Sequence, residues 1–312
     1  MQHSKLMRSG FPAMGTHATV EVVMDETTPF AAERGIDLLD TAEKRVLELE
    51  ARWSRFIETS EVSALNRYRG RPVRVSQATR LLVRRAIEGW RLTAGSFNPT
   101  VYDAVVAHGY DRTLVDVMAS PTRARSRTAA APGCEGIDVD DLTGTVTLST
   151  TTGFDPGGIG KGLAADLVVD ELIGAGAAGA CVEIGGDVRV SGRGPEGRGW
   201  VVRIDHPALE GTELGQVWLT DGAIASSSIH RRNWVVAGET THHLLNPRTA
   251  RPTIGVSGAS VIASTGWRAE VLATATCVEG TGVHIESSGA CGFVVPLHGP
   301  PRRFGNVADF VA

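Results

Sequence analysis

A glycine-rich run near the middle of the chain restricts its fold and its ligands more than any other segment. Residues 155–162 read Asp-Pro-Gly-Gly-Ile-Gly-Lys-Gly and open into an apolar segment with helical spacing that stops at Gly174. Glycines lack a Cβ atom, so the backbone N–H groups of such a turn can approach a ligand closely. A helix N-terminus favours an anion, so the run predicts a phosphate site to which Lys161 adds positive charge. A glycine-rich connection with a solvated lysine explains the same residues.

The run departs from the two common nucleotide-binding loops. A P-loop needs a glycine five residues before its Gly-Lys pair and Ser or Thr after it, but Asp155 and Gly162 stand at those places. A Rossmann turn needs a third spaced glycine, where this chain has Leu163. A phosphate site at this run is therefore of another kind.

The rest of the chain has the pattern of an α+β protein. Apolar residues at 3,4,3,4 spacing, ending at Trp53, predict a long helix over residues 29–50. Further helices are expected over residues 76–93 and 266–278, and short strands over residues 17–24, 180–190, 200–205, 215–220, 233–237 and 292–296. Long helices with meandering strands favour α+β over strict βαβ repetition. No linker divides the chain, so we expect one domain over residues 1–312, with residues 119–133 as an exposed loop.

Bulk properties exclude several classes of protein. The apolar fraction of 42% and the charged fraction of 21% are those of a soluble globular protein. A net charge of −4 and a pI of about 6.2 provide no overall positive field to recruit nucleic acid or an anionic membrane. The four cysteines have no CxxC spacing, which excludes a zinc ribbon. No run resembles a signal peptide or reaches the length of a membrane span, so the expected location is the cytoplasm.

Polar groups recur in other segments where a site can form. Residues 96–100, 184–187, 221–228 and 242–249 are rich in Gly, Ser, Asp, Asn or His, although a turn explains each segment alone. Glu270 and Thr274 are four residues apart on a predicted helix, so they share a face. Carboxylate and hydroxyl oxygens suit Mg²⁺. Spacing alone favours a surface glutamate and a threonine bonded to its own helix.

The order of these segments is more specific than any one of them. The series comprises Met14-Gly15-Thr16, residues 56–66, Phe97 to Val101, His108-Gly109-Tyr110, residues 155–166, Ile184 to Asp187, Ala225-Ser226-Ser227, residues 243–249 and residues 269–275. It resembles the FAD:protein FMN transferase family, also called ApbE-like. The resemblance covers about residues 11–296, nearly the whole chain.

The resemblance implies a fold, an activity and partners. The fold is an α+β, T-fold-like arrangement of mixed helices and antiparallel sheets, with FAD between the glycine-rich loops. Members use Mg²⁺, or Mn²⁺, to cleave the FAD pyrophosphate and attach FMN by a phosphoester bond to a Ser or Thr of a partner flavoprotein, with release of AMP. Two alternatives stay open: an FAD pyrophosphatase that yields FMN and AMP, and a catalytically impaired FAD-binding protein.

The resemblance also assigns residues. The metal ligands carried over are the Gly160 carbonyl, Glu270 and Thr274, and the catalytic residues are His243 and Ser227. The residues expected to bind FAD are Met14, Phe97, Asn98, Asp155, Gly157, Gly158, Lys161, Gly185, Gly186 and Asp187. His243 is the expected general base, because a near-neutral pKa suits proton transfer. His242 and His243 are neighbours that point to opposite faces of a strand, so only one can face the ligand.

Five positions depart from the family pattern. Glu270, Asn246 and Asn98 replace Asp, Ser228 replaces Gly, and Gly160 replaces Ala. Glu270 extends the carboxylate by one methylene, and Mg²⁺ demands near-ideal octahedral geometry. Asn246 removes a charge near the expected base, which should lower the pKa of its imidazole. These departures are the reason that the impaired alternative is retained.

Overall fold

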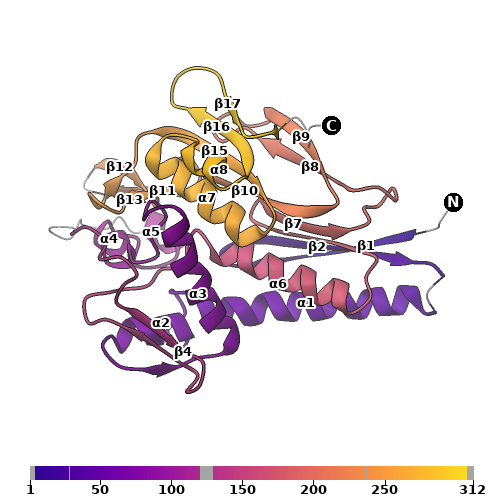
Figure 1. The fold of residues 1–312 in the computed structure, drawn as a ribbon, viewed down its shortest axis with the longest axis horizontal. Helices are drawn as coiled ribbons and strands as arrows, with labels where there is room; N and C mark the ends of the chain where they lie inside the picture. The colour runs from indigo at the N-terminus through magenta and orange to yellow at the C-terminus, as the bar shows by residue number, and fades with distance from the viewer. Residues whose placement is uncertain (1–3, 28, 120–128, 237, 308–312) are drawn as a thin grey trace.

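One antiparallel sheet of eight strands contains both the first and the last strand of the structure, at its two opposite edges (Figure 1). The computed structural model describes residues 4–27, 29–119, 129–236 and 238–307. The strands follow the order β1 (Ser4–Ala13), β2 (Thr16–Asp25), β6 (Gly179–Ile184), β7 (Asp187–Gly192), β10 (Asp221–Ser228), β15 (Val256–Ala263), β16 (Cys291–Pro296) and β17 (Arg302–Phe304). Every neighbouring pair is antiparallel. Together with the helices, this sheet confirms the α+β class.

Three helices cover one face of the sheet and a hairpin covers the other. Helix α1 (Ala31–Trp53) packs on β1 and β2, α6 (Gly160–Gly174) on β6 and β7, and α7 (Gly266–Glu279) on β10 and β15. Helix α6 also contacts both α1 and α7, so the three form one layer (Figure 1). The hairpin of β8 (Trp200–Asp205) and β9 (Glu213–Leu219) contributes apolar residues to a second core with strands of the sheet.

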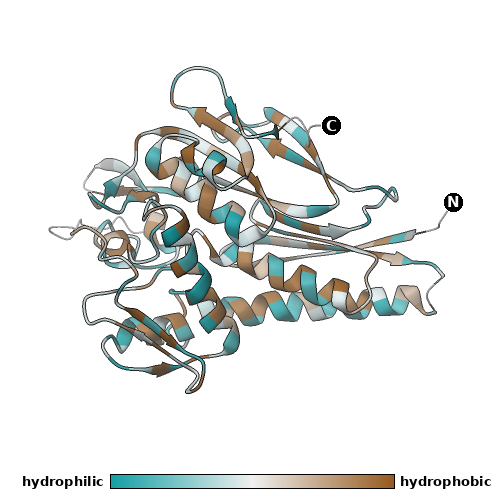
Figure 2. Ribbon diagram, in the orientation of Figure 1, coloured by the Kyte–Doolittle hydropathy of each residue, from teal (hydrophilic) through white to brown (hydrophobic). Residues whose placement is uncertain are grey.

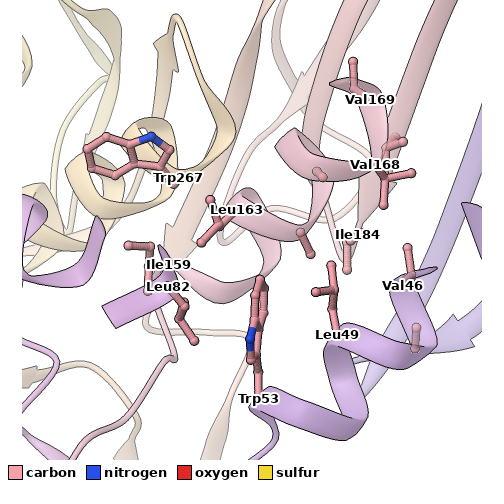
Figure 3. Close-up of a cluster of buried hydrophobic side chains, with 14 of the residues drawn as sticks. Val46, Leu49, Trp53, Leu82, Ile159, Leu163, Val168, Val169, Ile184 and Trp267 are labelled. Atoms are coloured by element: carbon pink, nitrogen blue, oxygen red, sulfur yellow. The ribbon is translucent and has the colours of Figure 1, made fainter. Parts of the chain in front are cut away.

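Amphipathic patterning explains how α1 is placed. Its buried residues include Leu39, Val46, Leu49 and Trp53, which recur every three, four or seven residues, while most of its exposed residues are polar (Figure 2). Figure 3 shows Leu49 and Trp53 in one cluster with apolar residues of α6 and the sheet. Burial of this stripe fixes the end of α1 beside the start of α6.

The smaller elements lie outside the main layers. The helices are α2 (Glu61–Arg67), α3 (Gln77–Leu92), α4 (Tyr102–Ala107), α5 (Leu114–Ala119) and α8 (Val283–Ser287). A three-stranded sheet contains β3 (Val73–Arg74), β4 (Ile137–Asp140) and β5 (Thr145–Leu148). Two strand pairs follow β10 along the chain: β11 (Asn233–Val236) with β12 (Glu239–His242), and β13 (Leu245–Asn246) with β14 (Arg251–Pro252). No helix within the described ranges is both long and apolar enough to cross a lipid bilayer.

Most predicted elements are confirmed within a few residues, and two predictions are wrong. The strand expected over residues 180–190 is two strands, because Gly185 and Gly186 adopt φ angles of 61° and 91° and turn the chain into a hairpin. Residues 221–228, expected as a loop, form the central strand β10. Residues 120–128 of the expected exposed loop lie outside the described residues, and residues 129–133 have no regular structure.

Candidate active site

A cavity of about 460 Å³ collects the predicted site residues from distant parts of the chain. Thirteen of the fifteen line it: Met14, Phe97, Asn98, Asp155, Gly157, Gly158, Gly160, Lys161, Gly185, Ser227, His243, Glu270 and Thr274. Gly186 and Asp187 do not line it, but Asp187 contacts Lys161, which does. The cavity volume is in the range of small-molecule sites.

The glycine-rich turn lies at the start of α6, although several of its amides are already bonded. The N–H of Gly157 donates to Asp155 Oδ1 (2.8 Å), that of Gly160 to the Pro156 carbonyl (2.9 Å), and that of Gly162 to Glu270 Oε2 (2.8 Å). The expectation of free amides is therefore wrong for these three. An anion at this turn depends more on the Lys161 side chain than the sequence suggests.

A buried arginine anchors the first residue of the turn. Arg55 Nε lies 3.2 Å from Asp155 Oδ2, with side-chain exposures of 6% and 10%. Its guanidinium lies 4.2 Å from the centre of the Phe56 ring and 4.5 Å from that of Tyr110, and its Nη1 donates to the Tyr110 carbonyl (2.7 Å). The pair therefore links the glycine-rich turn to the segment after α4.

A close crossing of α6 and α7 positions Glu270. At Gly162 an added Cβ would collide with the backbone of Gly266, so both helices need glycine where they meet. Asp166 of α6 accepts hydrogen bonds from the first amides of α7, Gly266 N (2.6 Å) and Trp267 N (2.9 Å). A carboxylate at a helix N-terminus satisfies unpaired amides and the helix dipole. Glu270 thereby comes to lie one turn further on, over the start of α6.

Lys161 joins two buried carboxylates at the cavity wall. Its Nζ lies 3.2 Å from Glu270 Oε1 and also contacts Asp187 Oδ2. Asp187 Oδ1 accepts a hydrogen bond from the Ser226 amide (3.0 Å). Burial lowers the pKa of Lys161, and the Glu270 carboxylate acts in the opposite direction. Glu270 is only 4% exposed, so the alternative of a surface glutamate is wrong.

The residues expected to hold a metal line the same cavity. Gly160, Glu270 and Thr274 all line it, and Thr274 Oγ1 lies 3.2 Å from Ser227 Oγ. Gly158 lacks a Cβ that would lie 3.1 Å from Thr274 Oγ1, which keeps this hydroxyl accessible beside the turn. Carbonyl, carboxylate and hydroxyl oxygens are the donors that Mg²⁺ prefers, so the donor set fits this ion. Within the described part of the chain, no three His, Cys, Asp or Glu side chains form a metal-binding group.

The two neighbouring histidines have different surroundings, as predicted. His243 lines the cavity and its Nδ1–H donates to the Arg232 carbonyl (3.3 Å), which leaves Nε2 as the ring's acceptor. His242 is not among the lining residues, and its Nε2–H donates to the Thr253 carbonyl (2.9 Å). Burial, helped by the nearby Arg232 guanidinium, lowers the pKa of His243 to about 3. The expectation of a near-neutral pKa is therefore wrong for the ligand-free protein.

Comparisons with known proteins place this geometry in a family. A sequence model of the ApbE family matches residues 14–286. The chain belongs to the ApbE family. It is 28% identical to an FAD:protein FMN transferase of Vibrio cholerae over an alignment of 274 residues. That alignment covers 86% of this chain and 80% of the relative. The chain is 34% identical over 190 residues to an FAD:protein FMN transferase of Rhodobacter capsulatus, covering 60% of this chain and 35% of that relative.

Solved structures of ApbE proteins share the fold. The crystal structure of the ApbE protein of Thermotoga maritima superposes with a TM-score of 0.83 at 24% identity, covering 99% of this chain and all (100%) of the other. The flavin transferase ApbE of Vibrio cholerae superposes with a TM-score of 0.78 at 22% identity, with the same coverage. These likenesses confirm the expected ApbE-type architecture.

Three of the residues that depart from the family pattern form hydrogen bonds with neighbours two residues along the chain. Asn98 Oδ1 accepts hydrogen bonds from the amide (2.9 Å) and the hydroxyl (2.7 Å) of Thr100. Asn246 Oδ1 accepts from the Arg248 amide (2.9 Å), and the residue is not among those that line the cavity. Ser228 Oγ accepts from the His230 amide (3.1 Å). Because Asn246 lies outside the cavity lining, we attribute the lowered pKa of His243 to burial and to the Arg232 guanidinium rather than to Asn246.

Sequence reasoning missed three arginines that line the cavity. Arg55 lies one residue before the block that begins at Phe56, and no local pattern marks it as buried. Arg231 and Arg232 follow β10 and form no ion pair with a carboxylate among the residues that the structure describes. Two adjacent arginines without a nearby acidic residue in sequence were the available signal. Arg231 and Arg232 therefore add positive charge to the cavity, whereas the charge of Arg55 is paired with Asp155.

Proposed function

We propose that this ApbE-family chain is a metal-dependent FAD:protein FMN transferase. The observation that carries the proposal is the single cavity in which thirteen residues, assigned by resemblance before any geometry was considered, come together. The names of the curated relatives support the same activity. The acceptor is a Ser or Thr hydroxyl of a partner flavoprotein, and the products are the FMN phosphoester and AMP.

Protein groups supply positioning and charge for this reaction. Phosphoryl transfer depends on both more than on covalent chemistry by the enzyme. Lys161, Arg231 and Arg232 face the cavity and offset the charge of the FAD pyrophosphate. The Gly160 carbonyl, Glu270 and Thr274 would hold Mg²⁺ or Mn²⁺. When bound, the ion supplies positive charge that offsets the charge developing on the departing AMP.

His243 accepts the proton of the incoming hydroxyl. The acceptor oxygen forms a bond to the FMN phosphorus while the bond from that phosphorus to AMP breaks. Nε2 of His243 is the free acceptor because Nδ1–H is bonded to the Arg232 carbonyl. Bound pyrophosphate raises the pKa of this imidazole above its ligand-free value, since neighbouring negative charge favours the imidazolium. Ser227, beside Thr274, contributes a second hydroxyl at the metal-binding oxygens.

Incubation with FAD, Mg²⁺ and a flavoprotein acceptor domain tests the proposal. Intact-mass spectrometry should detect an FMN adduct on the acceptor, and chromatography should detect AMP. FMN that appears in solution without an acceptor identifies a pyrophosphatase instead. FAD that stays intact overnight with either Mg²⁺ or Mn²⁺ refutes the enzymatic reading and leaves an FAD-binding protein.

The neighbouring histidines offer a matched pair of variants. His243→Ala should lower the turnover of bound FAD by about 10²-fold or more while FAD affinity changes little. His242→Ala removes an imidazole bonded to Thr253 outside the cavity, so its turnover should stay close to wild type. Equal turnover in the two variants contradicts the assignment of His243 as the base.

A further inference from the structure

Each carboxylate oxygen of Glu270 already has one partner in the ligand-free protein. Gly162 N–H occupies Oε2 at 2.8 Å and the Lys161 ammonium occupies Oε1 at 3.2 Å. The glutamate side chain is 5% exposed, so little water competes for these oxygens. An incoming cation at this carboxylate therefore meets the positive charge of the Lys161 ammonium, which repels it. The helix amide is fixed by the backbone, whereas the lysine side chain can move.

The Lys161 ammonium lies where positive charge is needed most. It contacts both Glu270 and Asp187, whose side chains are 5% and 3% exposed. Two buried carboxylates with no cation between them would each bear a large desolvation cost. One ammonium neutralises only part of the joint charge of these two carboxylates. Lys161 itself is 19% exposed and lines the cavity, which leaves it a path to a ligand.

We propose that Lys161 acts as a placeholder for the divalent ion in the ligand-free protein and competes with that ion for Glu270. The inference rests on the proposed metal-dependent transfer. The pyrophosphate of FAD offers Lys161 another anion, so FAD binding draws the ammonium off Glu270 and opens the carboxylate to the ion. Binding of FAD before the metal is then the preferred order, while the ion alone binds the ligand-free protein more weakly because it must displace the ammonium. Lys161 thus controls access to the metal ligand in addition to any contact with phosphate.

Mn²⁺ binding to the ligand-free protein tests this competition without any turnover. Lys161→Met removes the competing charge, so the Mn²⁺ dissociation constant, measured by electron paramagnetic resonance of free Mn²⁺, should fall by about tenfold or more. Lys44→Met removes the same charge from an exposed position on α1 and should leave the constant unchanged. Lys161→Gln keeps a polar head group and replaces the methionine variant if that variant does not fold.

A second measurement uses the wild-type protein alone. The chain has three lysines, Lys5, Lys44 and Lys161, so Nζ resonances in ¹⁵N-lysine-labelled protein can be assigned by substitution. Titration with Mg²⁺ should shift the Lys161 resonance and leave the other two in place. An unshifted Lys161 resonance, or an unchanged or weaker Mn²⁺ affinity in the Lys161 variants, overturns the proposal. FAD cleavage is assayed separately, so this result does not decide the proposed function.

Discussion

Replacing Arg55 by methionine should destabilise the protein because it leaves the buried Asp155 carboxylate without its cationic partner. The guanidinium and Asp155 are 3.2 Å apart, with side-chain exposures of 6% and 10%. Removal of one partner from such a pair costs about 3–5 kcal/mol. Methionine keeps an apolar side chain but also removes the hydrogen bond to the Tyr110 carbonyl and the contacts of the guanidinium with the rings of Phe56 and Tyr110. The free energy of unfolding, measured by urea titration with circular dichroism, should fall by that amount.

Two comparisons make this prediction specific. Arg67→Met breaks an exposed pair with Glu58, with exposures of 48% and 88%, and should cost no more than about 1 kcal/mol. Adding Asp155→Asn to Arg55→Met removes the stranded charge, so the double variant should be more stable than the sum of the two losses implies. The reasoning is refuted if Arg55→Met costs no more than Arg67→Met, or if the two losses at the buried pair add.

Three further substitutions test other parts of the site. His243 stays neutral in the folded state to about pH 3, whereas the unfolded chain takes up this proton near pH 6.5. The unfolded state therefore binds more protons at pH 5, and the wild type should lose up to about 2 kcal/mol more than His243→Asn between pH 7 and 5 in urea titrations. Gly162→Ala forces a Cβ against the backbone of Gly266 and should cost about 1–3 kcal/mol, while Gly174→Ala, at the open end of α6, should be neutral or stabilising by thermal unfolding. Glu270→Ala should abolish ion-dependent FAD cleavage, whereas Glu270→Asp should keep the ion dependence. Glu270→Ala should also lower the free energy of unfolding by about 1–3 kcal/mol, because it leaves the Gly162 amide without a hydrogen-bond acceptor. A full Mg²⁺ response in Glu270→Ala would show that the ion binds elsewhere.

Periodicity predicted those elements whose burial is one-sided. Helix α1 has a single apolar stripe, so its spacing indicated both its type and its buried face. Strand β10 gave no such signal because most of its residues are small and its apolar residues are consecutive. Ala223 and Ala225 pack against Ala269 of α7, and small side chains are what this close approach requires. A requirement set by the neighbouring helix is invisible in the strand's own sequence.

The site residues became predictable through their order along the chain. Met14 and Thr274 are far apart in sequence and line one cavity only because the same sheet carries the β1–β2 turn and the strands on which α7 packs. No local pattern contains that information, whereas the ordered series of segments does. Arg55 was not predicted because it lies outside the ordered segments. Its partner Asp155 is known only once the fold places α1 next to the glycine-rich turn.

The distribution of charge around the cavity explains why a pyrophosphate suits it. The chain as a whole carries a net charge of −4, which repels anions at long range. At the cavity, Asp155 is paired with Arg55, and Lys161 is shared between two carboxylates. Arg231 and Arg232 line the same wall and lack carboxylate partners among the described residues, so their charge is directed at whatever enters. The two guanidinium groups complement the two negative charges of the pyrophosphate that the proposed reaction brings to this cavity.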